Sequence, residues 1–425
     1  MNASSQPAGA RRRVLVIIQG ELGDRPAGPE IRGWEIARAF ATRHDVTVVA
    51  TVDSEHRREG IRIVPRTRRS TVAEAMRHDV VIGPLLPPYL LLALARRRQV
   101  RVADLYDPVD LELSTLGEDW RARRLASQRQ TLRGVQLRSS DVVVCANEPQ
   151  RVRALEDLAH VGRTDEGPAI TTAGMGLPQA PAPSDDHPLR DHFEAIGRDD
   201  PLVLWWGSVW RWLDAPTAIH AIEILAERRP DVRFVITAGP PPNTLTGTLN
   251  ATEQARDVAR ERGLLDRNVF FLEEWVPFAE RHRYLRDADV GLTLHADSAE
   301  STLAARARYM DYVWAGLPSV LAQGDVVAAQ MAAAGAARLV VPGDPAATAR
   351  ALDELLSDRA ALDAARAACE SLAGELRWST VLEPLVACVE AIEPADRSLA
   401  RAFGVGRDAA GFYARRALNL CLGVS

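Results

Sequence analysis

Short apolar runs rich in β-branched residues alternate with helix-like segments along most of this 425-residue chain. Such alternation predicts strands connected by crossover helices, and therefore parallel sheets with helices on their faces. A segment rich in Pro, Ala, Gly and Asp interrupts the pattern from about residue 162 to residue 192, after which the pattern begins again. The chain is long enough for two domains that each bury a core. We therefore expect an α/β protein with two domains.

The two blocks are predicted to contain similar numbers of strands. In the first block the expected strands are Val14–Gln19, Asp45–Thr51, Ile61–Val64, Asp79–Ile82, Val100–Leu105 and Asp141–Ala146, with Ala169–Thr172 as a further candidate. In the second block they are Leu202–Trp206, Arg233–Ala238, Val269–Leu272, Val290–Leu294, Ser319–Ala322 and Arg338–Val341. Helices are expected between them, notably Ile31–Thr42 and a long helix near Leu111–Arg138. Ligands of open α/β sheets bind beyond the C-terminal ends of the strands, so functional residues are expected in the loops there.

The composition excludes several chemistries. The chain contains no lysine, so a phosphate-loop lysine, a Schiff-base lysine and a lysine general base are all excluded. The four cysteines (Cys145, Cys369, Cys388 and Cys421) include no close pair, which argues against a zinc site or a disulfide framework. The start of the chain lacks the apolar length of a signal peptide, and the longest apolar run, Leu85–Ala95, is too short to span a bilayer. We expect a cytoplasmic protein.

Charge is distributed unevenly along the chain. Residues 1–150 contain 24 arginines and 18 acidic residues, although the whole chain has a net charge of −5. A basic first half would suit an anionic partner such as a lipid headgroup, but a solvated surface is the simpler interpretation. The end of the chain, Phe412–Leu422, is also basic and amphipathic. We expect it to pack on the first domain, with peripheral contact at the inner membrane face as the alternative.

The most informative stretch lies between Glu300 and Pro318 and reads E-S-T-L-A-A-R-A-R-Y-M-D-Y-V-W-A-G-L-P. A carboxylate and a turn of small residues follow the predicted strand Val290–Leu294, and a helix begins after them. The N–H groups at such a helix start concentrate partial positive charge, which suits a phosphate or diphosphate. In a helix Arg308 and Asp311 share a face, so a carboxylate would lie beside the anion site. A nucleotide sugar needs this combination of groups.

This stretch resembles the carboxylate–helix–carboxylate signature of the retaining glycosyltransferases of family four, also called glycosyl transferases group 1. It is most similar to a bacterial branch with the pattern Glu-Thr-x-x-x-x-Arg-x-Arg-x-x-Asp-Tyr-x-Trp-Ala-Gly-Leu-Pro. The matching residues are Glu300, Arg306, Arg308, Asp311, Tyr312, Trp314, Ala315, Gly316, Leu317 and Pro318, and Ser301 stands where Thr is usual. In the broader family both acids are Glu and lie eight residues apart, whereas here they lie eleven apart and the second is Asp.

The resemblance implies the GT-B fold, in which two Rossmann-like domains face each other across a cleft. It implies an N-terminal acceptor-side domain over residues 10–175, a linker over 176–197, a donor-side domain over 198–395, and a final helix over 396–425 that crosses back to the first domain. The reaction implied is transfer of a sugar from a nucleoside-diphosphate sugar to an acceptor hydroxyl, with the leaving phosphate taking the acceptor proton. Neither a metal nor another cofactor is expected, and no nucleic acid.

The same resemblance implies roles for the residues of the signature. Glu300 is expected to position the sugar hydroxyls, and Arg306 or Arg308 to neutralise charge on the leaving diphosphate. Asp311 is expected to bind the ribose. The diphosphate itself is expected to bind the backbone of the short turn formed by Ser301, Thr302 and Leu303.

Three further segments of the second block are donor-site candidates. The segment that begins at Gly207 reads G-S-V-W-R-W-L-D and lacks the Gly-Arg and Lys of the broad family, so Arg211 is the candidate replacement cation. Its two tryptophans could stack on a sugar ring. The second segment, Trp275-Val276-Pro277, resembles a Gly-Trp-Val-Pro motif that contacts the base. The third candidate is His295, which either contacts the donor or caps its strand. The residues concerned are Trp210, Trp212, Trp275, Pro277 and His295.

Two segments of the first block are candidates for the acceptor side. The loop Gly28-Pro29-Glu30-Ile31-Arg32 resembles the family's Gly-Pro-Gly-Ile-Arg loop, with Glu30 in place of Gly. Asp107 is the leading catalytic candidate among four carboxylates that follow the fifth predicted strand, because so many acids together must be solvated, paired or used. In the second block the Asp287-Ala-Asp289 triplet has the spacing of a metal-binding pair, but its position between a predicted helix and a strand favours a structural role.

The function expected from these features is a retaining glycosyltransferase of cell-surface glycan, glycolipid or secondary-metabolite biosynthesis. Two alternatives remain open at this point, because the usual cations of the diphosphate grip are missing. One is a GT-B enzyme of another reaction type, such as a sugar-nucleotide epimerase or a pseudo-glycosyltransferase. The other is a non-catalytic partner that only binds a sugar nucleotide.

Overall fold

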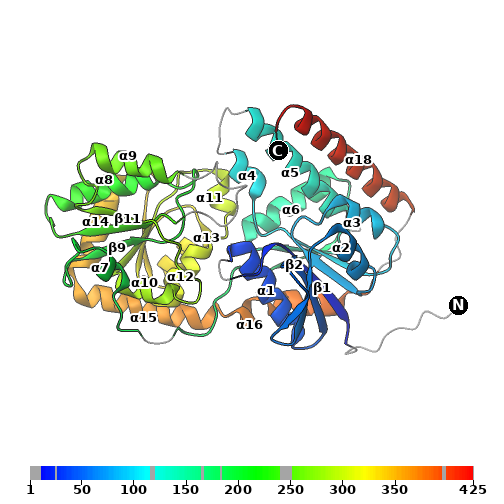
Figure 1. Ribbon diagram of the computed structural model, residues 1–425, viewed down its shortest axis with the longest axis horizontal. Coiled ribbons are helices and arrows are strands. Elements are labelled where there is room, and N and C mark those ends of the chain that lie inside the picture. The colour runs from blue at the N-terminus through cyan, green and yellow to red at the C-terminus, as the bar shows by residue number, and fades with distance from the viewer. Residues whose placement is uncertain are drawn as a thin grey trace. The chain divides into compact units, whose positions relative to one another are not determined.

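The computed structural model describes residues 11–23, 26–114, 120–163, 167–181, 184–239, 251–394 and 399–424. The chain divides into two compact units, each with its own parallel sheet (Figure 1). Unit 1 comprises Met1–Asp110, Trp120–Gly174 and Val381–Ser425, and unit 2 comprises Leu111–Asp119 and Met175–Thr380.

Unit 1 contains a sheet of eight strands within the described residues, in the order β3-β4-β2-β1-β5-β6-β7-β8. All neighbours are parallel except β3 and β4. The strands are β1 (Arg13–Glu21), β2 (Asp45–Thr51), β3 (His56–Arg58), β4 (Ile61–Pro65), β5 (Val80–Gly83), β6 (Val100–Asp104), β7 (Val142–Cys145) and β8 (Ala169–Thr172). Its helices are α1 (Gly28–Ala41), α2 (Arg68–Ala75), α3 (Pro88–Ala93), α5 (Trp120–Ser139), α6 (Glu148–His160), α17 (Glu383–Ala391) and α18 (Leu399–Cys421). Helix α4 (Val109–Ser114) lies where the chain passes from unit 1 to unit 2.

Unit 2 contains a fully parallel sheet of six described strands in the order β11-β10-β9-β12-β13-β14. The strands are β9 (Leu202–Trp205), β10 (Arg233–Thr237), β11 (Val269–Leu272), β12 (Val290–Thr293), β13 (Ser319–Ala322) and β14 (Ala337–Val340). Its helices are α7 (Pro188–His192), α8 (Ala215–Ala226), α9 (Thr252–Glu261), α10 (Arg281–Asp287), α11 (Ala299–Leu303), α12 (Ala307–Ala315), α13 (Val326–Ala333), α14 (Pro345–Ser357), α15 (Arg359–Glu375) and α16 (Trp378–Val381).

The apolar runs seen in the sequence form the sheets, because strands covered by helices on both faces must be apolar on both faces. All four residues of β9, for example, are buried. The prediction of two parallel α/β blocks is therefore confirmed. Strand β3 was not predicted, since its three residues His-Arg-Arg are all exposed and show no apolar pattern. The long helix expected near Leu111–Arg138 is represented by α4 and α5, and residues 115–119 lie outside the described part.

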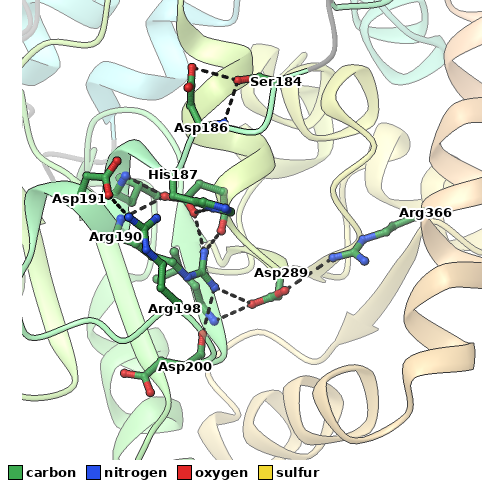
Figure 2. A network of polar contacts seen from close by, with 12 residues as sticks. Ser184, Asp186, His187, Arg190, Asp191, Arg198, Asp200, Asp289 and Arg366 are labelled. Carbon is green, nitrogen blue, oxygen red and sulfur yellow. Dashed lines mark hydrogen bonds and ion pairs between the residues drawn. The ribbon is translucent and has the colours of Figure 1, made fainter.

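The segment expected to be a linker, residues 176–197, belongs by its contacts to unit 2. Figure 2 shows the polar network that holds part of it. The buried carboxylate of Asp287 accepts hydrogen bonds from the backbone N–H groups of Leu189 (2.8 Å) and Arg190 (3.1 Å) at the start of α7. It also contacts His187 Nδ1 (2.9 Å) and the Arg190 guanidinium (2.6 Å). Asp289 accepts from Arg190 as well (3.3 Å), so this segment is anchored rather than free.

The end of the chain belongs to unit 1. Helix α18 packs along α5 and against α3, and Val405 of α18 is part of the same apolar core as Leu15 of β1 (Figure 1). Helix α17 is tied to the unit by Arg43, whose guanidinium contacts Glu383 (2.9 Å) and Glu390 (3.3 Å). The division of contacts thus assigns residues 381–394 to unit 1, whereas the sequence placed them in the second domain. Residues 10 and 395–398, at two expected boundaries, lie outside the described part.

Candidate functional site

Unit 2 has a change of strand order at β9. From β9 the chain adds β10 and β11 on one side, and then returns to add β12, β13 and β14 on the other side. Ligands of open α/β sheets bind beside the C-terminal strand ends at such a point, because the loops there diverge. The residues that follow these two strand ends, Gly207 after β9 and His295 after β12, were both predicted as site residues.

Gly207 forms a tight turn beside the start of α12. Its φ of +82° is in the left-handed region, which glycine adopts without strain. Its N–H donates to Thr237 Oγ1 at the end of β10 (2.7 Å). A Cβ at this position would lie 3.6 Å from Arg308 Nη2, so the turn brings backbone next to that guanidinium.

Arg308 lies in the first turn of α12. Its Nη2 donates to the Ser208 carbonyl oxygen (2.8 Å), and its guanidinium carbon lies 5.6 Å from the centre of the Trp205 ring. Its Nη1 is enclosed and donates to no atom of the described residues, and no described carboxylate pairs with it. Burial, together with the charge of the neighbouring Arg306, lowers the pKa of Arg308 to about 10. The site therefore holds a cation whose charge the described protein does not neutralise.

Arg306, two residues earlier, is neutralised. Its guanidinium makes two hydrogen bonds to Glu300 (2.8 and 3.2 Å), and its Nε lies 3.4 Å from Asp325 Oδ2. All three side chains are buried, and Glu300 is only 3% exposed. Asp325 also caps α13 by accepting from Val327 N and Ala328 N. Each oxygen of Glu300 thus accepts a hydrogen bond from Arg306, and the expected contact of Glu300 with sugar hydroxyls stays a prediction.

His295 is fully buried at the end of β12. Its Nδ1 lies 3.0 Å from the Ala296 carbonyl oxygen, so Nδ1 carries the proton and Nε2 is left as an acceptor. That Nε2 has no hydrogen-bond partner among the described residues. Burial, followed by the charge of Arg306, lowers the pKa of His295 to about 4. The imidazole is therefore neutral near pH 7.

Asp311 lies on α12, one turn after Arg308. Its Oδ2 accepts from Trp206 Nε1 (3.0 Å) and its Oδ1 from Arg281 Nε (3.0 Å). The guanidinium of Arg281 lies between two rings, 3.7 Å from the centre of Phe278 and 3.9 Å from that of Trp314. The carboxylate expected to bind ribose is thus held by the end of β9 and by α10, and it stays partly exposed.

The turn expected to bind the diphosphate forms the short helix α11. Ser298 and Ser301 make a reciprocal capping box, in which Ser301 N donates to Ser298 Oγ (3.2 Å) and Ser298 N to Ser301 Oγ (3.0 Å). Thr302 N donates to the Ser298 carbonyl oxygen (3.4 Å), and Thr302 itself is exposed while Leu303 is half-buried. The N–H groups of Ser301 and Thr302 are therefore used inside the turn. Helix α12 has no side-chain cap at its start, and its first N–H groups lie next to Arg308.

The remaining donor candidates lie in two loops. Trp210 and Trp212 stack on each other, with ring centres 5.4 Å apart and planes within 8°. Trp212 is buried and Trp210 half-buried, so one outer ring face at most is available to a ligand. Arg211 between them is exposed. In the loop after β11, Trp275 is half-buried and Pro277 exposed.

The candidates of unit 1 form a separate group at the ends of β1 and β6. Arg32 is fully buried and binds Asp104 through two hydrogen bonds (2.7 and 2.9 Å), while its third arm donates to the Gly174 carbonyl oxygen (2.6 Å). Gly28 and Pro29 are the first residues of α1, three residues earlier than the predicted helix start. Glu30 completes that helix start by accepting from Ala27 N (3.1 Å). Arg32 therefore forms a buried ion pair with Asp104, and the loop expected at residues 28–32 is the first turn of α1.

Asp107 follows β6 and is half-buried. It lies close to Tyr106, whose pKa is raised by burial and then by the charge of Asp107. Burial lowers the pKa of Arg129 on α5, and the charge of Asp107 offsets part of that decrease. Of the other acids in this run, Asp104 pairs with Arg32, and Asp110 pairs with Arg153 of α6. Asp107 therefore stays the candidate that the sequence predicted on this side.

Three residues of the unit 2 site were not found from the sequence: Arg281, Tyr309 and Asp325. Asp325 lies three residues after β13 and caps α13, so its position between a strand and a helix could have indicated it. Tyr309 is fully buried, and its hydroxyl has no partner among the described residues. Arg281 lies 30 residues before its partner Asp311, and no local pattern connects the two. No group of three or more His, Cys, Asp or Glu side chains in the described chain is placed to hold a metal ion.

No family model matches the sequence, and no curated protein matches it. Solved structures do match it. A sucrose-phosphate synthase from Thermosynechococcus elongatus gives a TM-score of 0.60 at 15% identity, covering 95% of this chain and 100% of that chain. HepE from Anabaena, in complex with UDP and glucose, gives 0.64 at 14% identity, covering 90% and 100%. A UDP-forming α,α-trehalose-phosphate synthase from Burkholderia xenovorans gives 0.65 at 14% identity, covering 90% and 99%. The chain has the GT-B fold of these proteins, which confirms the predicted fold class.

Proposed function

We propose that this protein is a retaining glycosyltransferase that moves a sugar from a nucleoside-diphosphate sugar to an acceptor hydroxyl. The donor binds unit 2 beside the ends of β9 and β12. Uridine is the base we propose first, because similar folds were solved with UDP or described as UDP-forming. The acceptor binds unit 1, near Asp107.

The observation that carries this proposal is the unneutralised guanidinium of Arg308. A buried cation is costly unless it is paired, and burial has already lowered its pKa to about 10. The Gly207 turn lies beside it and lets the backbone approach closely, and the start of α12, which has no side-chain cap, offers backbone N–H groups to an anion. A diphosphate beside this guanidinium would supply the missing charge. This arrangement takes over the role of the Gly-Arg and Lys pair that the sequence lacks.

In the proposed reaction the bond between the anomeric carbon and the diphosphate oxygen breaks, and a bond from the acceptor oxygen to the same face of that carbon forms. The acceptor proton passes to a phosphate oxygen of the departing nucleoside diphosphate. Arg308 stabilises the negative charge that develops on the leaving group, which is where a preorganised cation contributes most. The diphosphate is held by the guanidinium and by backbone, so we propose that no metal ion is required.

Glu300 acts indirectly in this proposal. Because both of its oxygens bind Arg306, it fixes that guanidinium and the turn between α11 and α12. Asp311 holds Trp206 and thereby the end of β9, and its exposed edge faces the ribose. We assign Glu300 and Arg306 as positioning residues and Arg308 as the residue that contacts the donor.

The test is thermal stabilisation of the purified protein by UDP-, GDP-, dTDP- and ADP-sugars and by each free diphosphate. We expect one nucleotide to raise Tm by several degrees, since a ligand at ~100 times its Kd stabilises a protein by about 2.7 kcal/mol. The same nucleotide should not shift the Arg308→Ala variant. No shift with any donor would overturn the proposed site. A shift without sugar transfer to any acceptor, and without epimerisation of the donor, would instead identify a non-catalytic binding partner.

A further inference from the structure

The side of α18 that faces away from unit 1 is apolar. Phe403 is 78% exposed and Leu418 51% exposed, and Leu399, Leu420 and Leu422 are also exposed. At 3.6 residues per turn, Leu399, Phe403 and Leu418 project opposite the buried face of the helix, in line with exposed Ala410 and Ala414. Large apolar side chains gathered along one exposed face indicate an interaction surface.

The opposite side of α18 packs against unit 1. Val405, Ala409 and Phe412 are buried against unit 1. Near the end of the helix Asn419 accepts from Arg124 (3.0 Å) and donates to Gln128 Oε1 (2.8 Å), both on α5. The outward apolar residues are therefore not needed to hold the helix in place. Among the described helices none is long and apolar enough to cross a bilayer.

Two further exposed apolar residues, Trp120 and Leu92, lie on helices that pack against α18. Arg138 pairs with Asp408, whereas Arg124 bonds Asn419, so α5 and α18 run antiparallel (Figure 1). Trp120 at the start of α5 therefore lies toward the end of α18, and it is exposed. Near the other end, Leu92 of α3 is exposed and lies within contact distance of a Cβ built on Gly406.

The same two helices carry a large positive charge. Helix α5 has six arginines and no acidic residue, and α18 has four arginines and one aspartate, a net formal charge of +9. Part of this charge is neutralised within unit 1, because Asp408 pairs with Arg138 and Arg407, and the buried Arg133 of α5 pairs with Asp157 of α6. Arg407 is exposed on the same face as Phe403 and Leu418, and Arg415 is exposed at the edge of that face. Arginine stems can lie along an apolar surface while the guanidinium reaches a polar headgroup.

We propose that the outward face of α18, with the exposed ends of α5 and α3, docks on an anionic phospholipid bilayer with the helix parallel to the surface. An apolar face flanked by arginines is the pattern of helices that lie in the interface between headgroups and acyl chains. Anionic headgroups complement the positive charge, whereas a second copy of this face would be repelled by it. This docking is independent of the nucleotide-sugar site of unit 2, and it goes beyond the proposed reaction.

The test is co-sedimentation of the full-length protein with vesicles of phosphatidylcholine alone or doped with about 30% phosphatidylglycerol. We expect binding to the anionic vesicles only, and about tenfold or greater loss of partitioning for the F403S/L418S double variant, because two large apolar side chains then stay in water. The R407Q/R415Q variant should lose about fivefold per arginine. The matched control is V152S/L155S on α6, which changes two similarly exposed apolar residues in the same unit and should bind as the wild type does.

Three results would overturn the proposal: no binding of the wild type to anionic vesicles, equal binding to neutral vesicles, or unchanged binding of F403S/L418S. A wild-type dimer that becomes monomeric in F403S/L418S, measured by light scattering, would show that a second copy covers the face and would also overturn it. Circular dichroism and Tm should match the wild type in every variant, since the substituted side chains are exposed. Reduced vesicle binding with an unchanged fold supports the proposal.

Discussion

Two buried charges of unit 2 behave in opposite ways. Asp287 is satisfied by the protein, because each of its carboxylate oxygens contacts two donors from residues 187–190. Arg308 donates to one carbonyl, has an enclosed Nη1 without a partner among the described residues, and pairs with no described carboxylate. A charge balanced within the fold stabilises it, whereas a charge left unbalanced is costly until a ligand arrives. Stability and activity should therefore separate between these two positions.

The largest effect is expected at Asp287. The Asp287→Ala variant leaves the Arg190 guanidinium without its main buried partner and frees two N–H groups at the start of α7. Removing one member of a buried pair costs about 3–5 kcal/mol, so the free energy of unfolding measured in urea should fall by about that amount. The control is Asp191→Ala, whose carboxylate pairs with Arg198 at the surface and should matter by less than about 1 kcal/mol. Equal losses in the two variants would contradict the anchoring role.

Arg308 should show the reverse pattern. The Arg308→Ala variant is expected to lose about 10²–10³-fold in kcat, as removal of a single group that stabilises developing charge does elsewhere. Its free energy of unfolding should stay the same or rise, because an unpaired buried cation is removed. Steady-state kinetics with the preferred donor, together with urea unfolding, measure both. Arg359→Ala, at an exposed position on α15, is the matched control and should change neither quantity.

Glu300 should lie between these extremes, since it is balanced by the protein but belongs to the site. The Glu300→Gln variant keeps one oxygen for Arg306 and loses the charge. Hydrogen bonds to charged groups contribute about 1.5–3 kcal/mol, so the variant should lose stability in that range and activity as well. A loss of activity with full stability would mean that Glu300 contacts the donor directly. That result would contradict its assignment as a positioning residue.

The fold could be read from the sequence because its signal is local. Each buried strand is a short apolar run, and the order of runs and helices leaves few other architectures. Thirteen expected strands, including the candidate at Ala169–Thr172, are present, and the edge strand β3 was missed because its residues are polar and solvated. The sequence also predicted Gly207, Arg308 and Asp311 as parts of one site. Gly207 follows the end of β9, and the other two lie on α12, which begins after β12.

What the sequence could not provide was the pairing of these charges. Arg306 and Arg308 look equivalent in the chain, yet only Arg306 faces Glu300 and Asp325. Arg32 matches the loop pattern of the family, but its guanidinium binds the carboxylate of Asp104, which lies 72 residues later in the chain. Such partners meet through the order of strands in the sheet, and no spacing in the chain encodes them. The same is true of Arg281 and Asp311.

The smallest effect, and the most direct view of the buried cluster, should come from pH. Burial raises the pKa of Asp325 from 3.8 to about 6, and burial lowers the pKa of His295 from 6.5 to about 4. The native state holds the Asp325 proton more tightly than the unfolded state, so this group costs stability as pH rises from about 4 to 6. His295 acts in the opposite direction, because its contribution is complete above pH 6.5 and is lost as pH falls toward 4.

The two trends partly cancel in the wild type, and single variants should reveal them. Relative to Asp325→Asn, which keeps the cap of α13, the wild type should lose on the order of 1 kcal/mol between pH 4 and 6. Relative to His295→Gln it should gain over the same range. Parallel pH profiles of unfolding for all three proteins would show that neither group is shifted by its burial.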